Sequence, residues 1–259
     1  QEVVPSLGVT EPGAVALCCA AASDNNSIMV SSIELTVSPN IYKNCMSVGI
    51  PGFSKKGIIA AAALGAAGGN YKLGLEALGG ITDKAVSICE KLIQDNKVKV
   101  AISDNGELLY IEAKCYGANG EGRCIISKSH SHICLIEKNG NLIYQASESE
   151  ENTTEDDSHN LCESSLKEIK ETVETMTEGE LSFLAEGAEK NISAARWGLE
   201  HKPGMGVGAH MLSLREQGLL ANSLSTELQI YTCAASDVRV SGSFVPIMTC
   251  AGSGNHGIT

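Results

Sequence analysis

The sequence of 259 residues lacks several features that would place it in a familiar class of protein. No stretch approaches eighteen unbroken apolar residues, so we expect no membrane-spanning helix and no membrane partner. No basic segment is followed by an apolar one near the start, so we expect no signal peptide. Lysine and arginine number 19 against 31 aspartates and glutamates, which gives a net charge of −12. Because a phosphate backbone needs a basic face, we also expect no nucleic-acid partner.

The ten cysteines show none of the spacings that are typical of a zinc site. No pair forms C-x-x-C, and no set of cysteines and histidines has zinc-finger spacing. Without a secretory signal, a disulfide framework is not expected either. We interpret the cysteines as reduced thiols that mostly serve as small buried apolar residues, and we predict a cytoplasmic location.

The hydrophobic patterns predict an α+β fold. Apolar runs rich in alanine and glycine at 10–22 and 56–69 predict buried helices, and residues 28–38 predict a strand that ends in a turn at Ser38-Pro39-Asn40. Further helices are predicted at 82–94, 161–176, 178–197 and 208–217.

Residues 98–146 show a different pattern, in which short alternating runs are separated by turns that contain glycine. This pattern predicts an antiparallel meander of strands at 98–103, 107–115, 122–128, 131–138 and 141–146, flanked by the helices at 82–94 and 161–176. The acidic stretch 147–160, which contains Glu148, Glu150, Glu151, Glu155, Asp156 and Asp157, is expected to be a surface linker. We therefore predict an Ala/Gly-rich helical domain, formed by residues 1–78 and 178–259, with an α+β domain of residues 79–177 inserted in it.

The two ends of the sequence suggest a fragment or one half of a split protein. The first residue is Gln1 rather than Met, and the chain stops in G-S-G-N-H-G-I-T at 252–259. A glycine-rich loop of this kind normally leads into a helix whose N–H groups complete an anion site, and we expect that no residues remain here to build that helix. The alternative is a flexible native tail.

Four clusters place polar residues among small or apolar ones. They are Thr10 and Glu11; Asn40, Lys43 and Asn44; His130 with His132; and Ser236, Asp237 and Arg239 followed by Ser253, Asn255 and His256. Each has a purely structural alternative, such as a helix cap, a turn, a surface face or an ordinary ion pair. The loop at 252–257 is more specific, because its backbone N–H groups suit a carboxylate or a phosphate.

That loop first suggests an enzyme that uses pyridoxal phosphate for β-elimination, because several such enzymes carry Ser-Gly-Asn-His-Gly beside the cofactor. The cofactor needs a Schiff-base lysine some tens of residues upstream in a Ser-x-Lys context. The nearest upstream lysine is Lys202, which lies in E-H-K-P without that serine. This interpretation is therefore disfavoured.

Together the clusters resemble a known family. The matching segments are V-P-S-L-G-V-T-E-P-G-A-V-A-L at 4–17, S-P-N-I-Y-K-N at 38–44, A-A-A-A-L-G-A-A-G-G-N at 60–70, the hairpin at His130, R-E-Q-G-L-L at 215–220, A-A-S-D-V-R at 234–239 and the final octapeptide. In this order they resemble the N-terminal part of the L-cysteine desulfidase family, which is related to the α chain of the iron–sulfur L-serine dehydratases.

The resemblance implies a lyase that works without pyridoxal phosphate. Such an enzyme converts L-cysteine or L-serine to pyruvate, ammonia, and sulfide or water, using a 4Fe–4S cluster held by three cysteines with one iron open to the substrate. The family places its first ligand between Gly8 and Thr10, where this chain has Val9, and the other two beyond Thr259. We therefore expect no metal ligands and no cluster in this chain.

The chemistry of the residues in the polar clusters suggests a role for each. We predict that His130 transfers a proton, that Lys43 and Arg239 hold a carboxylate, and that Glu11 and Ser253 complete the catalytic set. The predicted substrate-binding residues are Thr10, Asn40, Asn44, Ser236, Asp237, Arg239, Asn255 and His256, and we expect the clusters to converge on one pocket between the two domains.

The sequence leaves alternatives for the substrate, the activity and the protein partner. The substrate is a small amino acid, but the sequence does not separate cysteine from serine. A catalytically inactive amino-acid-binding or structural paralogue is the alternative to an enzyme, because Val9 cannot bind iron. A second copy in a homodimer, or a C-terminal half, is the expected protein partner.

Overall fold

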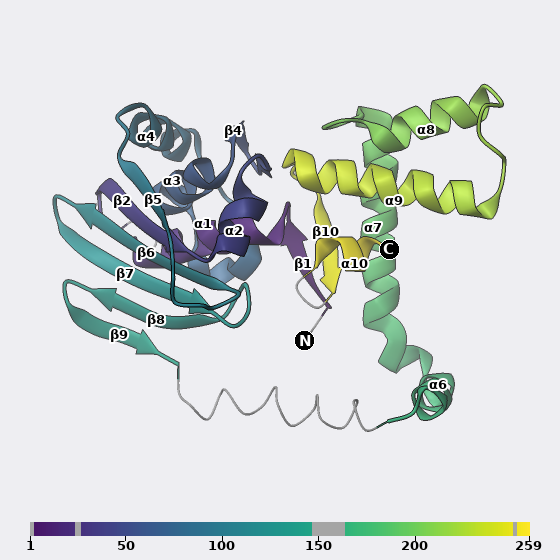
Figure 1. The fold of residues 1–259 in the computed structure, drawn as a ribbon, viewed down its shortest axis with the longest axis horizontal. Helices are drawn as coiled ribbons and strands as arrows, with labels where there is room; N and C mark the ends of the chain where they lie inside the picture. Colours follow the sequence, from purple (N-terminus) through teal and green to yellow (C-terminus); the bar gives the residue numbers. More distant parts are fainter. Residues whose placement is uncertain (1–2, 24–26, 147–163, 251–252) are drawn as a thin grey trace.

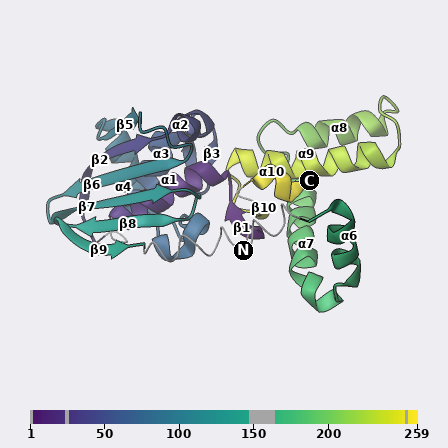
Figure 2. The ribbon, with the colours of Figure 1, turned by 60° about the horizontal axis from the view of Figure 1, so that its bottom comes forward.

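The computed structural model describes residues 3–23, 27–146, 164–250 and 253–259, which form an α+β fold (Figure 1). A six-stranded sheet and its covering helices make up one end of the molecule. The helices that follow residue 164 make up the other end, and a short two-stranded sheet lies between the two (Figures 1 and 2). Within the described part of the chain, no helix is long and apolar enough to span a membrane.

The large sheet is mixed rather than purely antiparallel. In sheet order its strands are β5 (Val98–Ile102), β2 (Val30–Val37), β6 (Tyr110–Gly117), β7 (Gly120–Ser127), β8 (Ile133–Lys138) and β9 (Asn141–Gln145). The predicted meander is confirmed from β6 to β9, where every neighbouring pair is antiparallel. It is wrong for β5, which pairs in parallel with β2, with Val98 opposite Ile33. The helices between β2 and β5 supply the crossover that a parallel pair requires.

One face of this sheet is covered by helices. Helix α1 (Thr10–Ala22) packs on β6 and β7, α3 (Ile58–Gly68) packs on α1, and α4 (Asp83–Gln94) packs on α3. The strands alternate accordingly, since Ile111 and Cys115 of β6 are fully buried whereas Glu112 and Lys114 lie on the open face. The hydrophobic core therefore sits between the sheet and α1.

Small residues let α1 and α3 approach closely, as the Ala/Gly-rich runs predicted. A Cβ atom added at Gly65 would lie 2.4 Å from the carbonyl oxygen of Ala16, so only glycine fits there. Every residue of α1 except Glu11 is buried. The one polar position that α1 leaves accessible is therefore at its start.

The predicted turn at Ser38-Pro39-Asn40 is instead the start of a helix, α2 (Pro39–Cys45). Ser38 is the N-cap and Pro39 is the first helical residue, where its missing N–H costs nothing. The chain continues through β3 (Gly49–Ile50), β4 (Phe53–Lys56) and a 3₁₀ helix, η1 (Tyr71–Glu76).

The other end of the molecule is helical. Helix α9 (Leu224–Ser241) packs on α7 (Glu178–His201) and on α8 (Val207–Glu216). Helix α6 (Leu166–Thr175) lies beside the start of α7 and away from the large sheet (Figures 1 and 2), so the prediction that it flanks the sheet is wrong. Most of its residues are exposed. The sequence pattern that predicted α6 is that of a surface helix, with a capping box at its start and lysine–glutamate pairs four residues apart. The acidic stretch 147–160 lies outside the described residues.

The segments near the two ends of the chain meet in the middle of the molecule. Strand β1 (Val3–Leu7) pairs antiparallel with β10 (Pro246–Cys250), and a short helix, α10 (Gly254–Ile258), follows. The glycine-rich segment, expected to be a loop, is therefore helical from Gly254, with the Ser253 hydroxyl accepting a hydrogen bond from the N–H of His256.

The predicted division into domains at residues 78 and 178 stays a prediction. Nevertheless β2, which precedes residue 78, lies between β5 and β6 within the large sheet, and α1 covers that sheet. These contacts favour a division in which the sheet and α1 to α4 belong to one unit.

Candidate functional site

A polar pocket of about 500 Å³ lies where the two ends of the molecule meet. Its walls come from the start of α1, from α2, from the turn before β8, from α9 and from the start of α10. The lining residues are Val9, Thr10, Glu11, Asn44, Val48, His130, Arg239, Val240, Ser253, Gly254 and Asn255. All four polar clusters of the sequence contribute to it.

Seven of the twelve predicted site residues line this pocket: Thr10, Glu11, Asn44, His130, Arg239, Ser253 and Asn255. Five do not: Asn40, Lys43, Ser236, Asp237 and His256. Their roles in a site stay predictions, and the fold gives the reason for the separation in most cases.

Three of these five residues lie outside the pocket because of where they stand on α2 and α9. Asn40 and Lys43 lie on the exposed side of α2, whereas Asn44 lines the pocket. Asp237 accepts a 3.0 Å hydrogen bond from the backbone N–H of Gly208 and so fixes the start of α8. Because residues two apart on a helix point in different directions, Asp237 and Arg239 do not form the ordinary ion pair considered from the sequence.

Arg239 is the most deeply buried charged group of the pocket, with 8% of the residue exposed. Its Nη1 donates a 2.7 Å hydrogen bond to Oδ1 of Asn255, and its buried Nε has no partner among the described residues. Burial lowers the pKa of Arg239, and the negative charge of Glu11 opposes that effect. A guanidinium has five N–H donors, so donors remain for an anion.

Glu11 provides the opposite charge. Its carboxylate accepts hydrogen bonds from Nδ2 of Asn44 at 2.8 Å and from Oγ1 of Thr10 at 3.0 Å. The first turn of a helix favours a negative charge, because the unpaired N–H groups there carry partial positive charge. Thr10 is the first residue of α1 rather than its cap, since Val9 holds the cap position.

His130 lies in the turn between β7 and β8 and is partly buried. Burial lowers the pKa of His130, with the charge of Glu11 acting in the opposite direction. The imidazole is therefore neutral near pH 7 and can accept a proton. His132 does not line the pocket; its Nδ1 lies 3.4 Å from Sγ of Cys134.

Two lining residues were not identified from the sequence. Val48 and Val240 form apolar parts of the wall and carry no motif that would single them out. Gly254 lies directly against the guanidinium of Arg239. A Cβ atom at position 254 would be 2.5 Å from Nε, so a larger residue would displace the arginine. A glycine at the start of a short helix beside a buried arginine is a signal that only the three-dimensional contact reveals.

The residues of the pocket do not fit an iron–sulfur cluster. Val9, at the position where the related family has its first ligand, is 6% exposed and offers only an isopropyl group. Across the described ranges, no group of three or more histidines, cysteines, aspartates or glutamates could hold a metal ion. Cluster ligands must be thiolates that converge. No step of the proposals below therefore passes through a cluster.

Comparison with known proteins identifies the family. A family model described as serine dehydratase alpha chain matches residues 83–259, more than half of the chain. The chain belongs to this family. That result confirms the resemblance to the serine dehydratase α chain, whereas the relationship to cysteine desulfidases in particular is not tested by it.

Curated relatives match over the whole chain. UPF0597 proteins of Alkaliphilus oremlandii, Clostridioides difficile and Clostridium botulinum are 35%, 34% and 37% identical to it. The chain spans about 60% of the length of these relatives. No solved structure matches the chain.

Proposed function

We propose that the pocket binds a small α-amino acid, L-serine or L-cysteine, as the substrate of a lyase that eliminates the β-substituent. The observation that carries this proposal is the pairing of a buried guanidinium with a carboxylate in one pocket. Arg239 lines the pocket from α9 and Glu11 lines it from α1. Both side chains have hydrogen-bonding groups that remain available to a ligand. A zwitterion needs a cation for its carboxylate and an anion for its ammonium group. Membership of the serine dehydratase alpha chain family supports the same substrate class.

In this proposal each lining residue has a defined task. Arg239 holds the substrate carboxylate, and Asn255 fixes the orientation of the guanidinium through its 2.7 Å hydrogen bond. Glu11 holds the ammonium group, and Asn44 orients the carboxylate of Glu11. Neutral His130 accepts the α-proton.

The reaction then balances with water as the only co-reactant. The Cα–H bond breaks and its proton passes to His130, a Cα–Cβ double bond forms, and the Cβ–S or Cβ–O bond breaks with its electron pair leaving on sulfur or oxygen. The proton held by His130 then passes to the leaving group, which departs as hydrogen sulfide or water and leaves the imidazole neutral again. The resulting enamine tautomerises to an imine, which water hydrolyses to pyruvate and ammonia. Ser253 and Thr10 contribute hydroxyl groups to the wall beside the leaving group.

Calorimetric titration of the chain with L-serine and with L-cysteine tests the binding step. We expect saturable binding that Arg239→Gln abolishes and that Arg196→Gln, a change on the exposed surface of α7, leaves unchanged. Pyruvate formation measured on the same samples tests the lyase step. Binding that survives Arg239→Gln would contradict the assignment of the carboxylate site.

A second candidate is an amino-acid-binding paralogue without catalytic activity. Val9, which offers no metal-binding group at the start of α1, favours it. Serine binding without pyruvate formation would support this candidate over the lyase. A cytoplasmic location remains part of the proposal and rests on the described cysteines, all of which are free thiols.

A further inference from the structure

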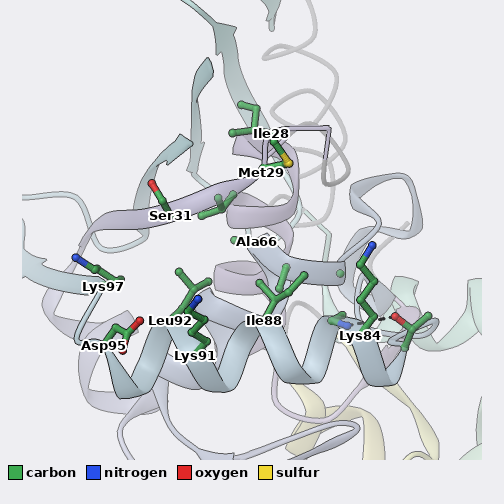
Figure 3. Close-up of a pocket in the computed structure, with 15 residues that line it drawn as sticks. Ile28, Met29, Ser31, Ala66, Lys84, Ile88, Lys91, Leu92, Asp95 and Lys97 are labelled. Carbon is green, nitrogen blue, oxygen red and sulfur yellow. Dashed lines mark hydrogen bonds between the residues drawn. The ribbon is translucent and has the colours of Figure 1, made fainter. Parts of the chain in front are cut away.

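A second hollow lies between α4, the end of α3 and the start of β2 (Figure 3). We call it the α4 groove. Its volume of about 710 Å³ falls within the range of roughly 300–1,000 Å³ that is typical of small-molecule sites. It shares no lining residue with the pocket around Arg239. The α4 groove is therefore a separate place for a ligand.

The floor of the α4 groove is apolar. Ile88 and Leu92 face it from α4, Ala66 from α3, and Met29 from the segment that enters β2 (Figure 3). Met29 is 65% exposed and Ile88 is 36% exposed. Large apolar side chains that line a concave surface gain free energy when a ligand removes them from water.

The rim of the α4 groove is positively charged. Lys84 and Lys91 lie two turns apart on one face of α4, and Lys97 follows the helix. Asp95 is the one acidic residue among the described residues of the lining. Within the described residues, none of the three lysines forms an ion pair with a carboxylate. This local excess of positive charge occurs in a chain whose net charge is −12.

The charges are not evenly distributed along the α4 groove. Asp95 lies one helical turn after Lys91 and close to the end where Lys97 is found, whereas Lys84 stands at the opposite end (Figure 3). Among the described residues, no carboxylate lines the groove at the Lys84 end. Lys84 is therefore a cation with no described carboxylate of the lining beside it, so it can pair with an anionic head group.

We propose that the α4 groove binds a fatty-acid-type ligand, an unbranched apolar chain that ends in a carboxylate. The chain lies along Ile88 and Leu92, and the carboxylate pairs with Lys84. The occupant is a small amphipathic molecule rather than a peptide, because a peptide backbone needs several polar partners. Ser31 and Thr82 are the only uncharged polar side chains among the lining residues that the structure describes.

Calorimetric titration of the 259-residue chain with sodium dodecanoate, kept below its micellar concentration, tests this proposal. We expect saturable binding of one dodecanoate per chain and a loss of about tenfold or more in affinity for Lys84→Glu. The matched control is Lys99→Glu, an exposed residue of β5 outside the lining, which should change the affinity by less than about twofold. Equal losses in both variants would show a general charge effect and overturn the site.

Two further variants test the floor. Ile88→Asp and Met29→Asp place a carboxylate in the α4 groove at partly exposed positions, so both variants should fold, as circular dichroism would show. Each should abolish dodecanoate binding, and unchanged binding in the folded Met29→Asp variant would overturn the proposal.

Three other probes separate the chemical features of the ligand. Acetate, which has the head without the chain, and dodecyltrimethylammonium, which has the chain with a cationic head, should not bind. Binding of dodecyltrimethylammonium as tight as that of dodecanoate would contradict the role of Lys84. Tighter binding of dodecyl phosphate than of dodecanoate would contradict the carboxylate and identify a phosphate head.

Discussion

Arg239 and Asn255 are joined by a 2.7 Å hydrogen bond from Nη1 to Oδ1, which ties helix α9 to helix α10 at the wall of the pocket. Asn255 is exposed, whereas 8% of Arg239 is exposed. The amide thus orients a buried cation without neutralising it. A substrate carboxylate would meet a guanidinium whose position is already fixed, which reduces the entropic cost of binding.

Replacement of Arg239 by lysine tests whether the planar guanidinium matters. Arg239→Lys keeps the positive charge but loses the fork that pairs with both oxygens of a carboxylate and with Asn255. We expect the dissociation constant for L-serine to rise about tenfold or more, which corresponds to about 1.4 kcal/mol. Arg196→Lys on exposed α7 is the control. Equal affinities in Arg239→Lys and the unmodified chain would show that charge alone suffices.

Gly254→Ala tests whether the close contact with Arg239 positions the guanidinium. The added Cβ atom would lie 2.5 Å from Nε, so the arginine must move. We expect weaker L-serine binding together with a loss of about 1–3 kcal/mol in the free energy of unfolding, as for other overpacked sites. The control is Gly80→Ala, where the added atom meets nothing within 4 Å. The measurements are urea unfolding and calorimetry.

The fold could be predicted wherever local periodicity decides the structure. The strands from β6 to β9 are joined by short turns, so alternation along the chain and pairing in space agree. Strand β5 has the same local pattern, yet its partner β2 lies more than 60 residues earlier in the chain. Nothing in the pattern of β5 identifies that partner, because pairing between distant strands is set by how α1, α3 and α4 pack.

The sequence indicated which segments meet at the pocket, but it did not indicate which polar side chains of each segment line it. All four polar clusters reach the pocket, yet only one residue of α2 does so. Ser38-Pro39-Asn40 begins helix α2 instead of forming the predicted turn. In the helix that forms, Asn44 lines the pocket and Lys43 is exposed. Which of these neighbouring polar side chains reaches the pocket depends on how α2 packs against α1, and the polar pattern of the sequence does not encode that packing.

The pH dependence of the free energy of unfolding tests whether His130 is held neutral in the folded protein. Burial lowers the pKa of His130, so on acidification the unfolded chain binds a proton before the folded chain does. The free energy of unfolding should therefore fall as the pH drops through about 6.5, the ordinary pKa of histidine. His130→Gln should make that fall smaller, whereas His256→Gln, at an exposed position, should not. Urea unfolding at about pH 7.5 and about pH 5.5 measures the difference. An identical pH dependence in His130→Gln would mean that the imidazole is not held neutral.

Reconstitution with iron and sulfide tests whether the cysteines of this chain can hold a 4Fe–4S cluster. We expect the 259-residue chain, purified without oxygen, to bind no stoichiometric 4Fe–4S cluster, because thiolates must converge to hold one. Val9 offers no donor at the start of α1, and the described residues include no group of three or more candidate ligands. The described cysteines are mostly buried, and burial raises the pKa of the Cys18, Cys19 and Cys45 thiols, which disfavours the thiolate form.

Val9→Cys serves as the matched variant for this measurement. One added thiolate cannot hold a cluster, so Val9→Cys should also remain without stoichiometric iron. Iron and sulfide analysis with the visible absorption band decides the outcome. About four irons for each unmodified chain, with pyruvate formation from L-cysteine, would show that other thiols have rearranged to act as ligands. In that case Val9 would not mark a lost ligand, and the lyase would be favoured over the inactive paralogue.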